Sequence, residues 1–276
     1  MKVVDEKYIL KTGIEIPKIA FGTWQIKPED SYEAVKNALN AGYHHIDTAL
    51  AYQNEEGCGK AINEFGRDKV FVTTKLPAEI KGYNETIEAF NKSLKNLGLD
   101  YVDLYLIHAP APWSNIYQDC EKENIESWKA MIELKNKGLI KAIGVSNFHE
   151  KDIKPLILAT GVIPDVNQIR YFIGNKQDKI TNYCQDNNIL IMAYSPLATG
   201  ELTNHEKIKD LAKKYNKSIS QICIRFCIQN NTLPIIKSLN PLHMKDNIDI
   251  DFVIDDNDMA YLNSLYHIAS TRENRS

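Results

Sequence analysis

Four side chains that can move protons or hold charge lie at or near the ends of apolar segments. Asp47 closes HHID, Lys75 closes VFVTTK, His108 closes VDLYLIH, and Tyr52 follows shortly after Asp47. A tyrosine hydroxyl has a pKa of about 10, which is too high for efficient proton donation at neutral pH. A lysine ammonium beside it lowers that pKa, and a carboxylate can keep the lysine charged. The set therefore predicts a proton donor directed at an oxygen that gains negative charge, as in carbonyl reduction, with His108 orienting that oxygen.

Each of these residues also has a purely structural interpretation. Asp47 could cap a turn, Lys75 could be a solvated strand end, and His108 could be a buried core histidine. Tyr52 could pack at a rim as one of 14 tyrosines. Their joint placement favours the chemical interpretation. None of them supplies a hydride, so a reduction also requires a bound cofactor.

Further polar residues also lie at the ends of apolar segments or interrupt them. They close or interrupt four other apolar segments, and they are Ser146, Asn147, Gln168, Tyr194, Ser195, Lys237 and Ser238. In a parallel barrel all strands end at one face, where the active site is built. Polar residues at so many strand ends predict a single site at that face.

The elements that must position these residues alternate along the chain. Eight short apolar segments are typical of strands buried on both faces: 18–24, 44–49, 70–75, 101–108, 140–147, 165–170, 189–195 and 233–238. Amphipathic segments follow them and predict helices: 31–40, 55–65, 84–97, 125–137, 151–158, 176–186, 205–215 and 218–229, with a final helix near 256–264. A polar turn is expected around Pro241.

Eight strand-then-helix units in this length predict an α/β fold of the (β/α)8 TIM-barrel type, forming one domain over residues 1–276. Alternation around Thr12-Gly13 predicts a short β-hairpin over Lys7–Ile16 ahead of the barrel. An open, doubly wound sheet is the alternative. Against it, the chain lacks a Gly-x-Gly-x-x-Gly after its first strand; the nearest string, Gly57-Cys58-Gly59, lacks the third glycine.

Composition excludes several classes of protein. The formal charge is −3 and hydrophobic residues make up 43%, which is typical of a globular protein without an electrostatic footprint for nucleic acid. No apolar run approaches the ~18 residues of a membrane helix, and the N-terminus lacks the pattern of a secretion signal. Five scattered cysteines predict buried free thiols in a reducing cytoplasm, and no metal site is expected.

A series of motifs resembles the aldo-keto reductases, in particular bacterial-type aldehyde or 2,5-diketo-D-gluconate reductases. The strings are FGTWQ (21–25), GYHHIDTALAYQNEEGCGKAI (42–62), TTKL (73–76), SLKNLGLDYVDLYLIH (93–108), IGVSNF (143–148), VNQI (166–169), AYSPL (193–197) and IIKS (235–238). The resemblance implies reduction of a small-molecule aldehyde or ketone by NADPH, with NADH also accepted, and a monomeric enzyme. Tyr52 would be the proton donor, with Asp47, Lys75 and His108 completing a tetrad.

The resemblance also implies which residues hold the ligands. The cofactor would be bound by Gly22, Thr23, Trp24, Asp47, Ser146, Asn147, Gln168, Tyr194, Ser195, Leu197, Lys237, Ser238, His243 and Asn247. Among these, Ser146, Asn147 and Gln168 would hold the carboxamide, and the Tyr194 ring would stack on the nicotinamide. The substrate would contact Trp24, Tyr52, His108 and Trp113.

Departures from the family pattern affect specificity. The family's proline before Lys-Ser is Ile236 here, and its arginine for the adenosine 2′-phosphate is His243, which predicts weaker discrimination against NADH. Many relatives have tryptophan where this chain has Ala109; Trp113 either refills that space or lies on a loop. The short polar tail Ala269–Ser276 predicts an open pocket.

Two other functions remain as alternatives. Lys75 at a barrel strand end could form a Schiff base, as in aldolase-type lyases, although Asp47 beside it would keep the amine protonated and poorly nucleophilic. The chain could also be a nicotinamide-binding sensor or regulatory barrel without significant turnover.

Overall fold

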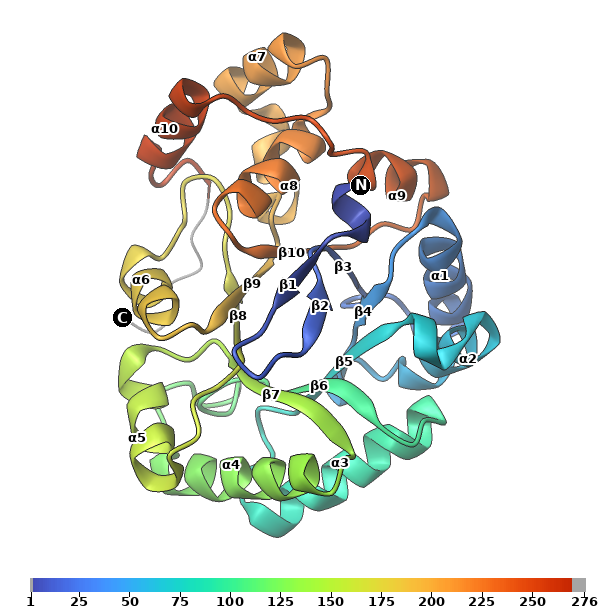
Figure 1. Cartoon of the computed structure of the whole chain (residues 1–276), viewed down its shortest axis with the longest axis vertical. Helices are drawn as coiled ribbons and strands as arrows, with labels where there is room; N and C mark the ends of the chain where they lie inside the picture. The colour runs from blue at the N-terminus through green and yellow to red at the C-terminus, as the bar shows by residue number, and fades with distance from the viewer. Residues whose placement is uncertain (1, 270–276) are drawn as a thin grey trace.

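A closed, eight-stranded parallel barrel forms the centre of the computed structural model, which describes residues 2–269. The strands follow one another around the barrel, and β10 closes it by pairing with both β9 and β3 (Figure 1). They are β3 (Ala20–Gly22), β4 (His45–Asp47), β5 (Phe71–Leu76), β6 (Val102–Ile107), β7 (Ile140–Ser146), β8 (Val166–Arg170), β9 (Leu190–Tyr194) and β10 (Leu233–Ile236). The predicted (β/α)8 TIM barrel is confirmed, and the open sheet is excluded.

The helices surround the barrel and cover its outer face (Figure 1). They are α1 (Pro28–Ala41), α2 (Glu55–Phe65), α3 (Tyr83–Leu97), α4 (Glu121–Asn136), α5 (Glu150–Thr160), α6 (Asp178–Asp186), α7 (Glu206–Lys214), α8 (Ile219–Gln229), α9 (Pro241–Ile248) and α10 (Asp256–Ser264). Strand side chains alternate between two cores. On β6, Leu104 and Leu106 fill the barrel interior, whereas Tyr105 and Ile107 pack toward the helices. Within residues 2–269, no helix has both the length and the apolar character needed to span a bilayer.

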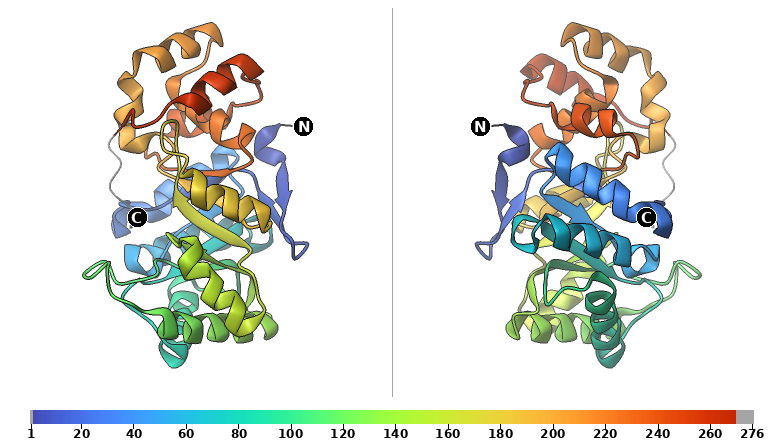
Figure 2. Two further views of the ribbon diagram at one scale, coloured as in Figure 1. Left: turned by 90° about the vertical axis from the view of Figure 1, so that its left-hand side faces the viewer. Right: turned by 90° about the vertical axis from the view of Figure 1, so that its right-hand side faces the viewer.

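The predicted N-terminal hairpin is also confirmed, and it closes one end of the barrel. Strands β1 (Lys7–Ile9) and β2 (Glu15–Pro17) pair antiparallel. Thr12 Oγ1 donates to Asp165 Oδ1, and the Tyr8 hydroxyl donates to the carbonyl of Thr232; these acceptors lie just before β8 and β10. The hairpin therefore covers the amino ends of the strands. The side views show the segment that follows β6 projecting at the opposite end (Figure 2).

The prediction of a polar turn at Pro241 is wrong, because helix α9 begins there. Asn240 caps it: its side-chain oxygen accepts a hydrogen bond from the backbone N–H of Leu242 at 2.9 Å. Pro241 occupies the first helical position, where its missing N–H costs nothing. An asparagine followed by proline is a recognised helix start, so the signal was present in the sequence.

Gly59 has a packing role rather than a phosphate-binding one. A Cβ at this position would lie 1.9 Å from the carbonyl oxygen of Leu97. Only glycine therefore lets α2 approach the end of α3 this closely. Helix α2 begins three residues after Tyr52.

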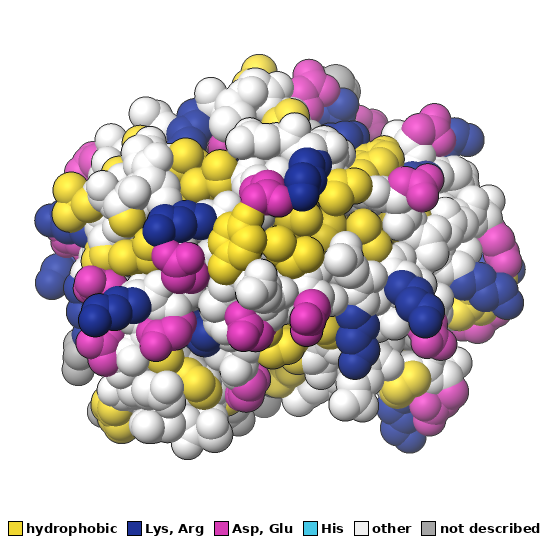
Figure 3. All heavy atoms as spheres, turned by 90° about the horizontal axis from the view of Figure 1, so that it is seen from below, with side chains coloured by type: hydrophobic (Ala, Val, Ile, Leu, Met, Phe, Trp, Pro, Cys, Tyr) yellow, Lys and Arg dark blue, Asp and Glu magenta, His cyan; other side chains and the backbone are white. Residues whose placement is uncertain are grey.

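The surface carries mixed charge. On the face shown in Figure 3, basic and acidic side chains are interspersed, and hydrophobic side chains form a band across the middle. No basic stripe forms on this face, in keeping with the formal charge of −3. All five cysteines, Cys58, Cys120, Cys184, Cys223 and Cys227, are buried and free, as predicted.

Candidate active site

Three neighbouring strands bring the acidic and basic residues to the carboxyl end of the barrel. Asp47 is the last residue of β4, Lys75 lies near the end of β5, and His108 directly follows β6. These strands pair side by side in the order β4, β5, β6. Tyr52 ends the short 3₁₀ turn Leu50–Tyr52, which follows β4. Parallel pairing thus gathers four residues that are distant in sequence.

Lys75 connects the cluster. Its Nζ lies 2.5 Å from Asp47 Oδ1, donates to the carbonyl of Thr48 at 2.9 Å, and lies 3.4 Å from the Tyr52 hydroxyl. The Lys75 side chain is fully buried and that of Asp47 is 4% exposed. A buried ammonium with three oxygen partners is well oriented, and its charge is little screened by water.

The pKa values of Lys75 and Tyr52 depend on burial as well as on neighbouring charge. Burial lowers the pKa of Lys75, but Asp47 and Tyr52 more than offset this and raise it overall. Lys75 is therefore a cation at neutral pH. Burial raises the pKa of Tyr52, and the Lys75 ammonium offsets only part of that effect. The predicted lowering by the lysine is therefore present, but the pKa of Tyr52 lies above its ordinary value because desolvation outweighs the neighbouring charge.

His108 lies on the other side of the tyrosine hydroxyl. Its Nε2 is 3.5 Å from the Tyr52 oxygen, and the two rings meet edge to face at 5.6 Å between centroids. Burial and the positive charges of Lys75 and Lys81 lower the pKa of His108 to about 3. Its Nδ1 has no hydrogen-bond partner within residues 2–269. A neutral imidazole at this place can donate or accept one hydrogen bond without adding a second cation.

The depressed histidine pKa predicts acid sensitivity. Burial and Lys75 also lower the pKa of His45 to about 3, whereas an unfolded histidine titrates at about 6.5. Between these values the unfolded chain binds more protons, so the free energy of unfolding should fall as pH falls through this window. We expect the His108 and His45 imidazole NMR signals to stay at their neutral positions at pH 5.

The variants His108→Gln and His45→Gln assign the two signals and provide the control. Each should weaken the loss of stability between about pH 6 and pH 4, measured by urea denaturation. Titration of either signal with a midpoint above pH 5 would contradict the assignment of buried, neutral rings.

A second cluster of amide and hydroxyl groups lies beside the tetrad. Gln168 Nε2 donates to Asp47 Oδ2 at 2.8 Å, and Ser146 Oγ donates to the Gln168 carbonyl at 2.9 Å. The Asn147 amide donates to the carbonyl of His108 at 3.0 Å and accepts from the Tyr194 hydroxyl at 2.8 Å. These four predicted residues are therefore brought together on one continuous network with the tetrad.

The residues predicted for the rest of the cofactor follow the neighbouring strands. Ser195 and Leu197 directly follow β9, with Ser195 in the left-handed region at φ 53°. Lys237 and Ser238 directly follow β10; Lys237 is exposed and Ser238 is half-buried. On α9, His243 is exposed, whereas Asn247 is buried and bonded to the Tyr43 hydroxyl.

Two tryptophans border the opening at the carboxyl end of the barrel, on the side of the tetrad. The loop after β3 carries Gly22, Thr23 and Trp24, and the Trp24 side chain is 44% exposed. Trp113 is 51% exposed, and its ring lies edge-on to the His108 ring at 6.0 Å between centroids. Trp113 therefore lies on a loop that returns toward His108. The open pocket is predicted from the short polar tail, and residues 270–276 of that tail lie outside the described residues.

The prediction overlooked Asn54, which ties two loops of the site together. Its amide donates to the carbonyls of Thr23 and Ile26 at 2.9 and 3.0 Å, and its oxygen accepts from Thr48 at 2.9 Å. The side chain is fully buried and so holds the Trp24 loop against the segment that leads to Tyr52. An asparagine directly before a helix is ordinarily a helix cap, but the Asn54 side chain makes no capping hydrogen bond to α2.

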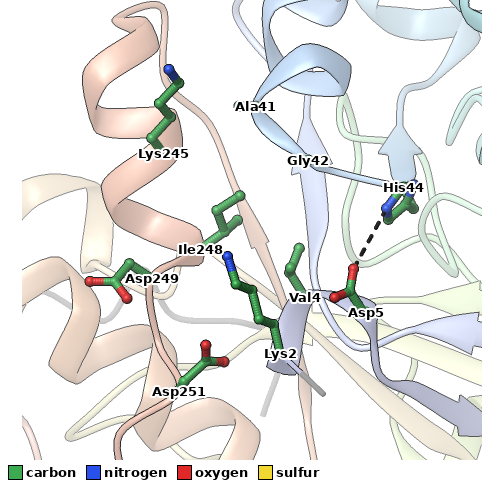
Figure 4. Close-up of a pocket in the computed structure, with 10 residues that line it drawn as sticks. All are labelled: Lys2, Val4, Asp5, Ala41, Gly42, His44, Lys245, Ile248, Asp249 and Asp251. Atoms are coloured by element: carbon green, nitrogen blue, oxygen red, sulfur yellow. Dashed lines mark ion pairs between the residues drawn. The ribbon is translucent and has the colours of Figure 1, made fainter.

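A hollow at the other end of the barrel is separate from this site. It has a volume of about 460 Å³. It lies between α9, the end of α1 and the 3₁₀ turn Val3–Asp5 (Figure 4). His44, which directly precedes β4, lines it and lies 3.9 Å from Asp5. It therefore opens at the amino ends of the strands, where barrel enzymes do not place their catalytic groups.

The closed barrel and the cluster at the carboxyl ends of its strands define the class of (β/α)8-barrel enzymes. A model of the aldo/keto reductase family matches residues 18–267. A glyoxal reductase of Bacillus subtilis is 37% identical over 260 residues, covering 93% of this chain and 91% of that relative. The crystal structure of an aldo/keto reductase from Brucella melitensis has a TM-score of 0.89 and 41% identity, covering 95% of this chain and 98% of that one. A Bombyx mori aldo-keto reductase in complex with NADP has a TM-score of 0.88 and 34% identity, covering 96% and 94%.

The chain belongs to the aldo-keto reductase family, which confirms the family predicted from its motifs. Members of this family are oxidoreductases that act on carbonyl groups of small molecules with a nicotinamide cofactor. The activity of this chain thus falls within carbonyl reduction.

Proposed function

We propose that this protein reduces aldehydes or ketones to alcohols with NADPH, and that Tyr52 is the proton donor. The observation that carries the proposal is the position of the Tyr52 hydroxyl, 3.4 Å from Lys75 Nζ and 3.5 Å from His108 Nε2. Incubation of the protein with NADPH and a panel of small aldehydes tests it, by the loss of reduced-nicotinamide absorbance. Turnover is the expected result, and no turnover across the panel would favour a sensor.

In the proposed mechanism, His108 and Tyr52 orient the carbonyl oxygen, and Tyr52 donates the proton to it. The raised pKa of Tyr52 keeps the hydroxyl protonated before the reaction. As its proton leaves, the Lys75 ammonium stabilises the tyrosinate in a site that excludes much of the water. Asp47 holds Lys75 in place through the 2.5 Å ion pair. NADPH, when bound, supplies the hydride.

The network beside the tetrad fits a nicotinamide carboxamide, because that group needs both donors and acceptors. We propose that Ser146, Asn147 and Gln168 hold it, and that the Tyr194 ring stacks on the nicotinamide. The hydroxyl and the two amides supply both kinds of group, and the Tyr194–Asn147 hydrogen bond fixes the ring orientation. Gly22, Thr23, Trp24 and Asp47 would border the same ring, Ser195 and Leu197 the pyrophosphate, and Lys237, Ser238, His243 and Asn247 the adenosine.

The geometry argues against a Schiff-base lyase. A nucleophilic amine must be neutral, whereas the Asp47 pair raises the pKa of Lys75. Borohydride trapping in the presence of an aldehyde distinguishes the two reactions. A covalent adduct at Lys75 would support the lyase, and its absence together with turnover supports the reductase.

The substrate we propose is a small carbonyl compound that contacts Trp24, Tyr52, His108 and Trp113. Both tryptophans present aromatic surface beside the reacting residues, and the Trp113 ring contacts His108. The name of the Bacillus subtilis relative, glyoxal reductase, is in keeping with a small aldehyde. We further propose a single domain over residues 1–276 that acts as a monomer in the cytoplasm; size-exclusion chromatography tests the oligomeric state.

Cofactor preference provides a direct prediction about His243. The His243 imidazole is exposed. It binds a 2′-phosphate less strongly than a guanidinium, which is always charged and binds phosphate through two hydrogen bonds. We expect His243→Arg to raise the NADPH-to-NADH ratio of kcat/KM by about 10-fold, in the range of one charged hydrogen bond. The matched control is Lys245→Arg on the same helix, which should leave the ratio unchanged. A strong NADPH preference in the wild type that His243→Arg does not increase would refute the idea.

A further inference from the structure

Arg170 is a buried arginine without a counter-ion in the described structure. The residue is 6% exposed, and its Nη1 is buried without a hydrogen-bond partner among residues 2–269. None of the ion pairs between described residues involves it. Its guanidinium lies over the Phe172 ring at 5.1 Å from the centroid. A permanent cation held in this way is costly unless an anion joins it.

The position of Arg170 on β8 directs its side chain toward the mouth of the barrel. Alternate residues of a strand share one face. Val166 packs in the barrel interior and Gln168 reaches Asp47, so Arg170 continues this inward row. It is the last residue of β8, one layer above Gln168 and nearer the opening.

The neighbouring strand places Arg170 beside the predicted nicotinamide platform. Arg170 and Tyr194 are register partners at the ends of β8 and β9. The backbone N–H of Tyr171 donates to the Tyr194 carbonyl, which keeps the two strand ends together. Arg170 therefore lies on the inward face, next to the residue that binds Asn147.

We propose that Arg170 is an anion-binding residue at the barrel mouth and pairs with an oxyanion group of a bound ligand. The proposal rests on the proposed function, because that function supplies the ligand. The shared chemistry is a carboxylate or phosphate oxygen, from either an acidic substrate or the cofactor. A guanidinium suits both, since its planar fork donates two parallel hydrogen bonds.

The test compares Arg170→Met with the wild type in two arms. The first arm measures kcat/KM for para-carboxybenzaldehyde and for its neutral isostere para-nitrobenzaldehyde. If the substrate carboxylate is the partner, the acid-to-neutral ratio falls about 10- to 100-fold, the range of a charged hydrogen bond. The second arm measures NADPH binding by tryptophan fluorescence without substrate. If a cofactor phosphate is the partner, Kd rises by a similar factor.

The matched control is Arg225→Met. Arg225 is a half-buried arginine on α8 that donates to the carbonyl of Ile250 and interacts electrostatically with Glu6 and Asp251. Arg225→Met should change neither the acid-to-neutral ratio nor the Kd for NADPH.

A second control is a shortened chain that ends at Ala269 and so lacks the acidic residue Glu273. It should retain the wild-type ratio and the wild-type Kd. An altered acid-to-neutral ratio or Kd in the shortened chain would contradict a ligand as the partner.

Unchanged values in both arms for Arg170→Met would overturn the proposal. If that variant does not fold, Arg170→Lys keeps the charge but loses the fork, and a loss of at least about threefold in one arm is expected. Wild-type turnover of the neutral aldehyde is measured in the same experiment. Failure of the anion site is thereby distinguished from failure of the proposed reductase activity.

Discussion

Tyr52→Phe should lower kcat about 100- to 10,000-fold, the range of a general-acid contribution, while the Kd for NADPH changes less than about twofold. The substitution removes only the hydroxyl that lies between Lys75 Nζ and His108 Nε2. The ring, its edge-on contact with His108 and the predicted cofactor residues remain. Steady-state kinetics and a fluorescence titration of NADPH give the two values.

The control for this variant is Tyr105→Phe, which also removes a buried tyrosine hydroxyl. Tyr105 lies on β6 but faces the helices, with its ring 5.0 Å from that of Phe90. Its hydroxyl has no partner among the described residues, so kcat should remain at the wild-type level. Wild-type kcat in Tyr52→Phe would remove Tyr52 from its proposed role.

Lys75→Met should impair both stability and activity. The change leaves the Asp47 carboxylate buried without its 2.5 Å partner, and breaking a buried pair in this way costs about 3–5 kcal/mol. It also leaves the effect of burial on Tyr52 unopposed, so the tyrosine pKa rises further. We expect kcat to fall at least about 100-fold. Urea denaturation and kinetics measure the two effects.

The double variant Asp47→Asn, Lys75→Met separates the two effects. It removes the unpaired charge, so most of the lost stability should return, as observed for buried ion pairs replaced as a unit. Activity should stay low, because the double variant still lacks the ammonium beside Tyr52. Recovery of kcat together with stability would show that Lys75 acts only on folding.

The barrel could be predicted because its signals are local. Continuous apolar runs such as VDLYLI are typical of doubly covered strands, and the structure buries every residue of Val102–Ile107. The tetrad residues lie at strand ends, so the barrel topology alone brings them to one face. Polarity alone predicts a turn at Pro241, whereas Asn240 followed by Pro241 is a helix start signal, and helix α9 begins there.

Other features of the site depend on contacts between distant residues. Gln168 forms a hydrogen bond with Asp47, which lies 121 positions away in the sequence. No local sequence pattern predicts that contact. The net pKa of Tyr52 is a balance between burial and Lys75, and only the folded structure gives the extent of burial. The ring contact of Trp113 with His108 depends on how a loop returns to the barrel.

The most direct test of carbonyl reduction uses NADPH deuterated at the nicotinamide carbon that gives up its hydride. The protein is incubated with this cofactor and a small aldehyde, and the alcohol is analysed by mass spectrometry and NMR. We expect one deuterium on the carbinol carbon, in an amount equal to the cofactor oxidised. Bound NADPH with no labelled alcohol from any aldehyde tested would contradict it.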